Sequence, residues 1–103
     1  MGYTNSPLVV YTKLSPNHSG QRTQSIDRIT PHCVVGQLSA ESICGCFTST
    51  SRQASCNYGI GTDGRVSLCV EEKNRSWCSS SNVNDQRAVT IECASDKSEP
   101  YAM

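Results

Sequence analysis

A hairpin signal near the middle of the chain constrains the fold most. Two short apolar runs, residues 56–61 and 65–70, flank the turn sequence Thr62-Asp63-Gly64. Asp-Gly suits a tight turn because glycine readily adopts the positive φ that such a turn requires. The pattern therefore predicts two antiparallel strands joined within a few residues.

Two further apolar runs, residues 28–35 and 88–93, predict strands before and after this hairpin. Pro31 lies inside the first run and has no N–H to donate to a neighbouring strand. We therefore expect that strand at an edge of the sheet or at a bulge.

A helix is predicted between the first strand and the hairpin. Ser39 suits an N-cap, and the apolar residues that follow at helical spacing predict a helix to about residue 49. The order strand, helix, hairpin, strand favours an α/β fold with a mixed central β-sheet and helical cover.

The domain organisation follows from length and composition. A chain of 103 residues suffices for one small domain. Prolines and small polar residues predict an N-terminal arm over residues 1–27, with one short strand near residues 8–11, and the domain itself over residues 28–103. The polar residues 71–87 predict a surface loop.

The sheet is expected to need further cover. Because the sequence predicts only one convincing helix, we expect the fold to be incomplete at the C-terminus, so that a missing C-terminal segment or a homo-oligomer covers the sheet.

Charge and hydropathy exclude two classes of partner. Nine basic and nine acidic residues give zero formal net charge, so we expect neither nucleic acid nor a membrane surface as a partner. No apolar run approaches the roughly 20 residues that span a bilayer. The N-terminus shows no signal peptide, so localisation stays unknown, and lysis or a holin-like route would release the protein.

Seven cysteines are many for a chain of this length. A small secreted protein with this number would suggest a disulfide framework. Four of them lie in or beside apolar runs, where cysteine behaves as a small buried hydrophobe: Cys33, Cys56, Cys69 and Cys93. We therefore expect mostly reduced thiols.

Several segments together resemble a known enzyme family. They are residues 28–36 with His32, residues 54–65 with the Asp-Gly turn, Arg75-Ser-Trp77, and residues 87–93 with Glu92. In this order they resemble the zinc-dependent N-acetylmuramoyl-L-alanine amidases, of the phage endolysin and peptidoglycan recognition protein type, over about residues 28–95. The arm sequence from Ser15 to Arg22 is similar to that of clostridial phage amidases.

The resemblance implies a metal ligand and a catalytic base. It gives His32 the role of first zinc ligand and Glu92 the role of general base. From the residues alone, a lone histidine is more often structural, and Glu92 could instead pair with Arg87 or Arg65. The family takes its remaining ligands from further downstream, so the zinc site is expected to be incomplete here, and the thiols of Cys78 or Cys93 stay open as substitutes.

The resemblance also implies substrate-binding residues. Arg75 and Trp77 match a segment that lines the substrate groove, with Cys78 where histidine is usual. Trp77 could stack on a sugar or peptide, or pack as a loop anchor. Asn82, Asn84 and Asp85 could hydrogen-bond a muropeptide or only shape the loop.

The implied activity is a peptidoglycan hydrolase, an endolysin or autolysin that lyses the cell wall. It would cleave the amide between N-acetylmuramic acid and L-alanine. The alternatives are a non-catalytic peptidoglycan-binding module and a structural fragment that needs a partner.

Overall fold

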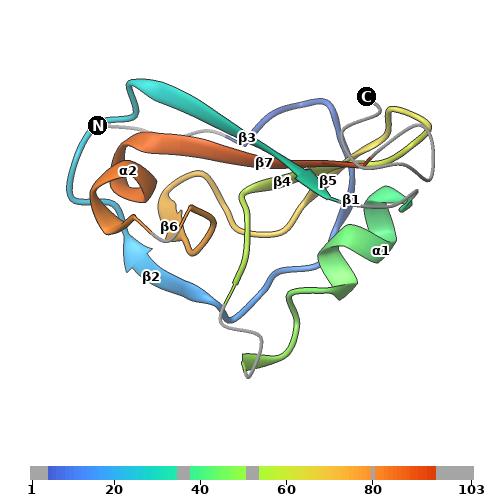
Figure 1. The fold of residues 1–103 in the computed structure, drawn as a ribbon, viewed down its shortest axis with the longest axis horizontal. Helices are drawn as coiled ribbons and strands as arrows, with labels where there is room; N and C mark the ends of the chain where they lie inside the picture. The colour runs from blue at the N-terminus through green and yellow to red at the C-terminus, as the bar shows by residue number, and fades with distance from the viewer. Residues whose placement is uncertain (1–4, 35–37, 51–53, 80, 95–103) are drawn as a thin grey trace.

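A five-stranded sheet forms the centre of the molecule (Figure 1). The computed structural model describes residues 5–34, 38–50, 54–79 and 81–94. Within them the sheet order is β1-β5-β4-β7-β3. Its strands are β1 (Val9–Thr12), β3 (Arg28–Val34), β4 (Tyr58–Ile60), β5 (Val66–Leu68) and β7 (Ala88–Ala94). Only β4 and β5 pair antiparallel, so the sheet is mixed, and the predicted α/β class is confirmed.

The β4–β5 hairpin is confirmed. Gly64 has a φ of 86° in the turn, and its N–H donates to the carbonyl of Gly61 at 2.9 Å. The Asp63 carboxylate accepts from the N–H of Arg65 at 3.0 Å. The local turn chemistry thus closes the hairpin that the sequence predicts.

Strand β3 occupies one edge of the sheet, as Pro31 predicts. It pairs in parallel with β7 along its whole length, and the register places His32 opposite Glu92. Pro31 has no N–H to donate to a neighbouring strand. An edge strand accommodates it, because only one side of such a strand takes part in the hydrogen-bond ladder.

Helix α1 (Ala40–Gly45) packs against β5, β4 and β1. Ser39 caps it, since its Oγ accepts from the N–H of Ser42 at 3.0 Å. The buried core under this helix comprises Ile43, Cys44, Phe47, Cys56 and Cys69.

The prediction that this helix extends to about residue 49 is wrong. The helix ends at Gly45. The carbonyl of Phe47 accepts from the side chains of Ser15 and Asn17 in the N-terminal arm. Those distant side chains hold the chain beyond Gly45 in a non-helical path.

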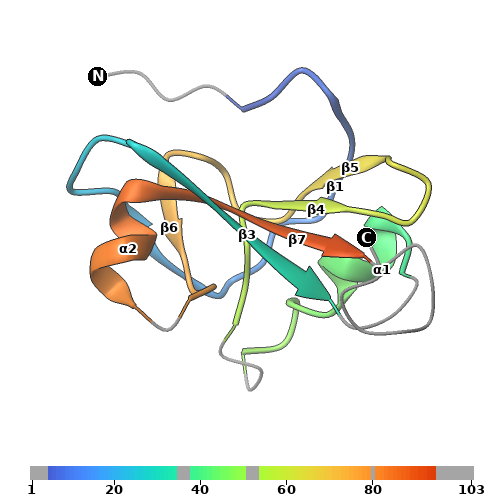
Figure 2. The ribbon, with the colours of Figure 1, turned by 45° about the horizontal axis from the view of Figure 1, so that its top comes forward.

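The loop predicted over residues 71–87 contains two regular elements. Strand β6 (Asn74–Ser76) pairs antiparallel with β2 (His18–Gln21), and helix α2 (Asn82–Arg87) packs beside β6 and β7. Figure 2 shows this small ribbon and α2 at one end of the sheet, with α1 at the other. The prediction of a plain loop is therefore wrong for these residues.

The N-terminal arm adds strands to both sheets. β1 pairs with β5, which confirms the strand predicted near residues 8–11, and β2 pairs with β6. The domain boundary at residues 27 and 28 stays a prediction, as does cover of the sheet by another segment or chain. Neither helix in the described ranges has the length and apolar character needed to cross a bilayer.

Candidate metal centre

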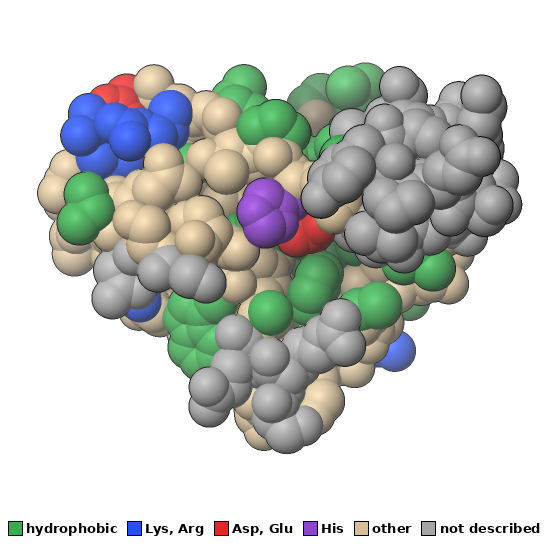
Figure 3. Space-filling view, viewed as in Figure 1, with side chains coloured by type: hydrophobic (Ala, Val, Ile, Leu, Met, Phe, Trp, Pro, Cys, Tyr) green, Lys and Arg blue, Asp and Glu red, His purple; other side chains and the backbone are tan. Residues whose placement is uncertain are grey.

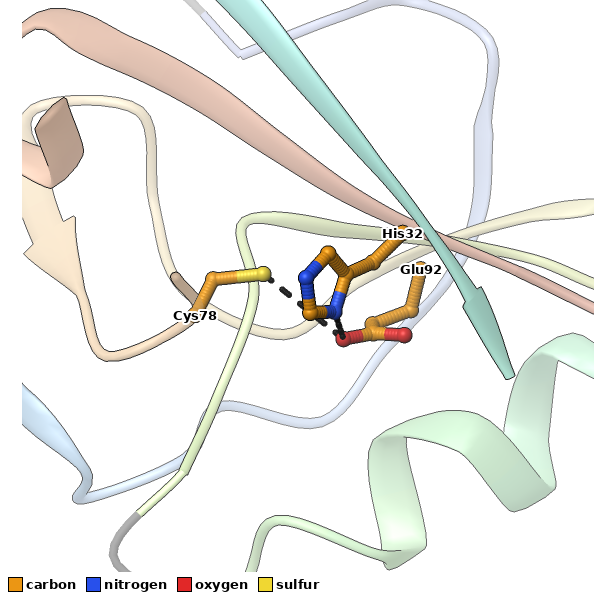
Figure 4. Close-up of side chains that lie close together, drawn as sticks. All are labelled: His32, Cys78 and Glu92. Atoms are coloured by element: carbon orange, nitrogen blue, oxygen red, sulfur yellow. Dashed lines mark hydrogen bonds and ion pairs between the residues drawn. The ribbon is translucent and has the colours of Figure 1, made fainter. Parts of the chain in front are cut away.

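His32 and Glu92 meet across two parallel strands. They are register partners on β3 and β7, so their side chains project from the same face of the sheet. Nδ1 of His32 lies 3.4 Å from Oε1 of Glu92 (Figure 4). The edge position of β3 leaves the His32 side chain about half exposed, whereas that of Glu92 is only 12% exposed.

Cys78 joins this pair from a third segment, just after β6. Its Sγ donates to Oε1 of Glu92 at 3.6 Å. One donor atom from each of His32, Cys78 and Glu92 lies within 4.8 Å of the others. Figure 3 shows a histidine beside an acidic side chain on this face, among apolar and uncharged side chains.

Asp85 holds the backbone on which Cys78 sits. This buried carboxylate, on α2, accepts from the N–H of Cys78 at 3.1 Å. It also accepts from the N–H of Ser79 at 3.3 Å and from its hydroxyl at 2.7 Å. Cys78 is therefore placed by contacts that its neighbours in sequence do not supply.

A buried polar network fixes β7 just before Glu92. The Asn57 side-chain oxygen accepts from the N–H of Thr90 at 3.1 Å and from the Arg22 guanidinium at 3.0 Å. The Asn57 amide donates to the carbonyl of Val70 at 3.0 Å. Thr90 lies two residues before Glu92, on the same face of the strand. The network thus sets the face from which the carboxylate projects.

Burial alters the acidity of the Glu92 carboxyl and of the Cys78 thiol. It raises the pKa of the Glu92 carboxyl, and the His32 imidazole and the Cys78 hydrogen bond offset this in part. Burial also raises the pKa of the Cys78 thiol to about 12, with the Glu92 and Asp85 charges adding to the effect. A carboxyl with a raised pKa can both accept and return a proton closer to neutral pH.

The donor set fits zinc. Imidazole nitrogen, cysteine sulfur and carboxylate oxygen are the three kinds of ligand that zinc takes in proteins. His32, Cys78 and Glu92 present one of each to a common space. The cluster could therefore hold such an ion with small side-chain adjustments, with His32 and Cys78 as ligands and the Glu92 carboxylate beside the ion.

The remaining predicted residues lie around this cluster rather than in it. The side chains of Arg75 and Trp77 both donate to the Ser19 hydroxyl, Trp77 at 2.8 Å. Asn84 donates to the Thr30 hydroxyl at 2.9 Å, two residues before His32 on β3. The side chain of Asn82 lies outside the described part of the structure. Within the described part of the chain, no hydrogen bond or ion pair joins Arg75, Trp77 or Asn84 to His32 or Glu92.

Asp85, Asn57 and Arg22 support the site, and sequence reasoning gave none of them that role. From the sequence, Asp85 is expected either to hydrogen-bond a muropeptide or to shape the loop, and no spacing rule links Asn57 to Thr90. Arg22 and Asn57 bind residues more than 30 positions away in the sequence, whereas Asp85 binds Cys78 only seven positions before it. Only an N-cap serine at position 81 followed by Asp85 hinted at an ordered turn here.

Comparison with known protein families gives a match over most of the chain. A protein-family model described as N-acetylmuramoyl-L-alanine amidase matches residues 22–103. The matched range includes His32, Cys78 and Glu92 and covers most of the chain. No curated protein matches the sequence significantly.

Proposed function

Because this chain belongs to the N-acetylmuramoyl-L-alanine amidase family, we propose that it hydrolyses the amide between N-acetylmuramic acid and L-alanine in bacterial peptidoglycan. The observation that carries the proposal is the contact between His32 and Glu92. It brings an imidazole and a shielded carboxyl together at the surface. A cell-wall hydrolase of the endolysin or autolysin kind is the biological role that this activity serves.

His32 is the proposed zinc ligand. Its ring is exposed enough to take up an ion and lies beside a carboxylate that favours positive charge nearby. When bound, zinc supplies Lewis acidity to the scissile carbonyl. The exposed side of the ring faces the solvent from which a cell-wall chain must approach.

Glu92 is the proposed general base. Its carboxylate takes the proton from the attacking water, and the resulting acid returns it to the amino group of the departing L-alanine. Its raised pKa suits both steps, because burial disfavours the charged form and eases protonation. A positioned base of this kind contributes about 10²–10⁴-fold to the rate.

Arg75, Trp77, Asn82 and Asn84 are the proposed substrate-binding residues. Trp77 directly precedes Cys78 in the chain, and its indole N–H donates to the Ser19 hydroxyl on β2; its ring is the proposed surface on which a sugar or peptide stacks. Asn84 flanks the same face through its contact with Thr30. Replacing Trp77 by Ala should raise KM for peptidoglycan and leave metal content unchanged.

The experiment is an assay of the full chain, loaded with zinc, on purified peptidoglycan. Release of new L-alanine amino termini reports amide cleavage, and elemental analysis reports zinc. We expect Glu92→Gln to keep zinc and lose at least about 100-fold in rate. His32→Ala should lose both zinc and cleavage, whereas His18→Ala should keep both, because His18 lies on β2 and its Nδ1 accepts from the N–H of Gly20.

Two outcomes would contradict the proposal. Binding of peptidoglycan without new amino termini would identify a non-catalytic binding module. Full cleavage by Glu92→Gln would exclude Glu92 as the base.

A further inference from the structure

We propose that Cys78 is a ligand of the metal ion at this site and that its sulfur restricts the site to thiophilic divalent ions such as zinc, cobalt and cadmium. This inference rests on the metal role proposed above for His32. It adds a donor from a third segment of the chain and a chemical class of ion.

The position of the Cys78 sulfur supports the assignment. Zinc holds an imidazole nitrogen at about 2.0–2.1 Å and a thiolate sulfur at about 2.3 Å, which places tetrahedral donors about 3.5 Å apart. The corresponding atoms of His32 and Cys78 lie within 4.8 Å of each other. Figure 4 shows both side chains approaching the same carboxylate oxygen of Glu92 from different segments.

One donor is held firmly and the other can adjust. The backbone of Cys78 is fixed by Asp85, and the preceding residue, Trp77, donates its N–H to the Ser55 hydroxyl at 3.0 Å. His32 stands half exposed on an edge strand, where its ring has room to rotate. The imidazole can therefore close the remaining distance to an ion held by Cys78.

Cys93, the other cysteine near Glu92, is excluded by strand geometry. Cys93 follows Glu92 directly on β7, so its side chain projects from the opposite face of the sheet. Its register partner is Cys33, which lies next to His32 and faces the same way as Cys93. Cys78 is thus the thiol on the His32 face among these three.

The chemistry of binding is a simple exchange. The Cys78 S–H bond breaks, the sulfur–metal bond forms, and the proton passes to solvent, with no change of oxidation state. A thiolate donor favours zinc, cobalt and cadmium, whereas magnesium and calcium prefer oxygen ligands. The site should therefore discriminate strongly against the last two ions.

Cobalt(II) titration of the full-length protein tests this inference. A cobalt–thiolate bond gives an intense near-ultraviolet charge-transfer band that nitrogen and oxygen ligands do not produce. We expect the wild type to develop this band and reach its plateau at one equivalent of cobalt. Cys78→Ser should lose the band and bind cobalt at least about 10-fold more weakly, whereas the matched control Cys93→Ser should keep both.

A second variant distinguishes loss of the sulfur ligand from a folding defect. Cys78→His replaces sulfur by another good zinc donor, so it should bind one cobalt ion without the band. Circular dichroism of each variant confirms that the secondary structure is kept. A band that persists in Cys78→Ser, or cobalt bound by the wild type without the band, would overturn the inference.

The result is separable from the test of hydrolysis. A cobalt–thiolate band in a protein that releases no L-alanine amino termini supports the Cys78 ligand and refutes the amidase activity. Cleavage with a bound ion but no thiolate band supports the amidase activity and refutes the Cys78 ligand. A wild type that binds no cobalt refutes the Cys78 ligand.

Discussion

Nδ1 of His32 lies 3.4 Å from Oε1 of Glu92, although the helix α1, the β4–β5 hairpin and the β6–α2 segment separate them in sequence. The parallel register of β3 and β7 creates this contact. A one-residue shift of β3 would send the imidazole to the other face of the sheet. The pairing of these two strands therefore decides whether the cluster exists.

The Glu92 carboxyl should make the stability of the metal-free protein depend on pH. Burial raises its pKa in the folded state. The stability associated with an acid of raised pKa is fully present below the unfolded pKa of about 4.3 and is lost as pH rises through the folded pKa. Glu92→Gln, which stays neutral, should therefore have a higher Tm than wild type at pH 7, and the difference should close near pH 4.

Thermal unfolding between pH 4 and pH 8, in the presence of a chelator, measures this effect. Glu71→Gln, at a half-buried position outside the cluster, controls for the loss of one negative charge. A difference in Tm that stays constant across the range would show that Glu92 does not titrate as described.

Asp85 should act on the proposed metal site as a positioning residue. Asp85→Ala removes the acceptor for the Cys78 and Ser79 N–H groups and should weaken cobalt binding by about 10–100-fold. Cobalt titration with the charge-transfer band as readout distinguishes a displaced sulfur from general destabilisation. Asp63→Asn, in the exposed hairpin turn, should bind like wild type. Unchanged cobalt affinity in folded Asp85→Ala would contradict this role.

Arg22 should be a major source of stability. Its guanidinium is buried and donates to the carbonyls of Glu72 at 2.6 Å and Asp85 at 2.7 Å, as well as to Asn57. Arg22→Ala leaves these acceptors without their donor and should reduce the free energy of unfolding by about 3 kcal/mol or more.

Urea denaturation measures the effect of Arg22. The control is Arg28→Ala, whose exposed side chain pairs with Asp27 at 3.1 Å and should cost less than about 1 kcal/mol. Equal midpoints for the two variants would show that the buried network contributes little.

Gly61 should not tolerate a methyl group. A Cβ there would lie 2.5 Å from the backbone nitrogen of Ala40, where α1 begins, so the helix or the hairpin would have to move. Gly61→Ala should cost about 1–3 kcal/mol by overpacking. Gly45→Ala, at the end of α1 with open space around it, should instead stabilise by about 0.5–1 kcal/mol. Thermal unfolding of the two variants should shift Tm in opposite directions; a shift in the same direction would contradict this packing.

Local chemistry explains what could be predicted of the fold. The Asp63-Gly64 turn, the Ser39 cap and the edge position of Pro31 each depend on residues close in sequence, and the structure confirms all three. The end of α1 depends instead on Ser15 and Asn17, which bind the carbonyl of Phe47 from the arm. Helical spacing carries no information about such partners.

Distant partners also decide the structure of β6 and α2. Their sequence is polar and reads as a loop, because few apolar residues mark a buried face. Their order comes from pairing with β2 and from the contacts of Arg22 and Asp85. Hydrogen bonds between distant segments satisfy the backbone groups of a polar segment, so its regular structure appears only in the folded chain.

The sequence by itself determined the identity of the candidate residues: a histidine in one apolar strand, a glutamate in another, and their resemblance to an amidase. Only the tertiary structure decided that they touch and that Cys78 joins them. The physical reason is that residue type sets the chemistry a side chain can perform. Its neighbours in space are set by strand register and by buried hydrogen bonds, such as those of Asn57 and Asp85.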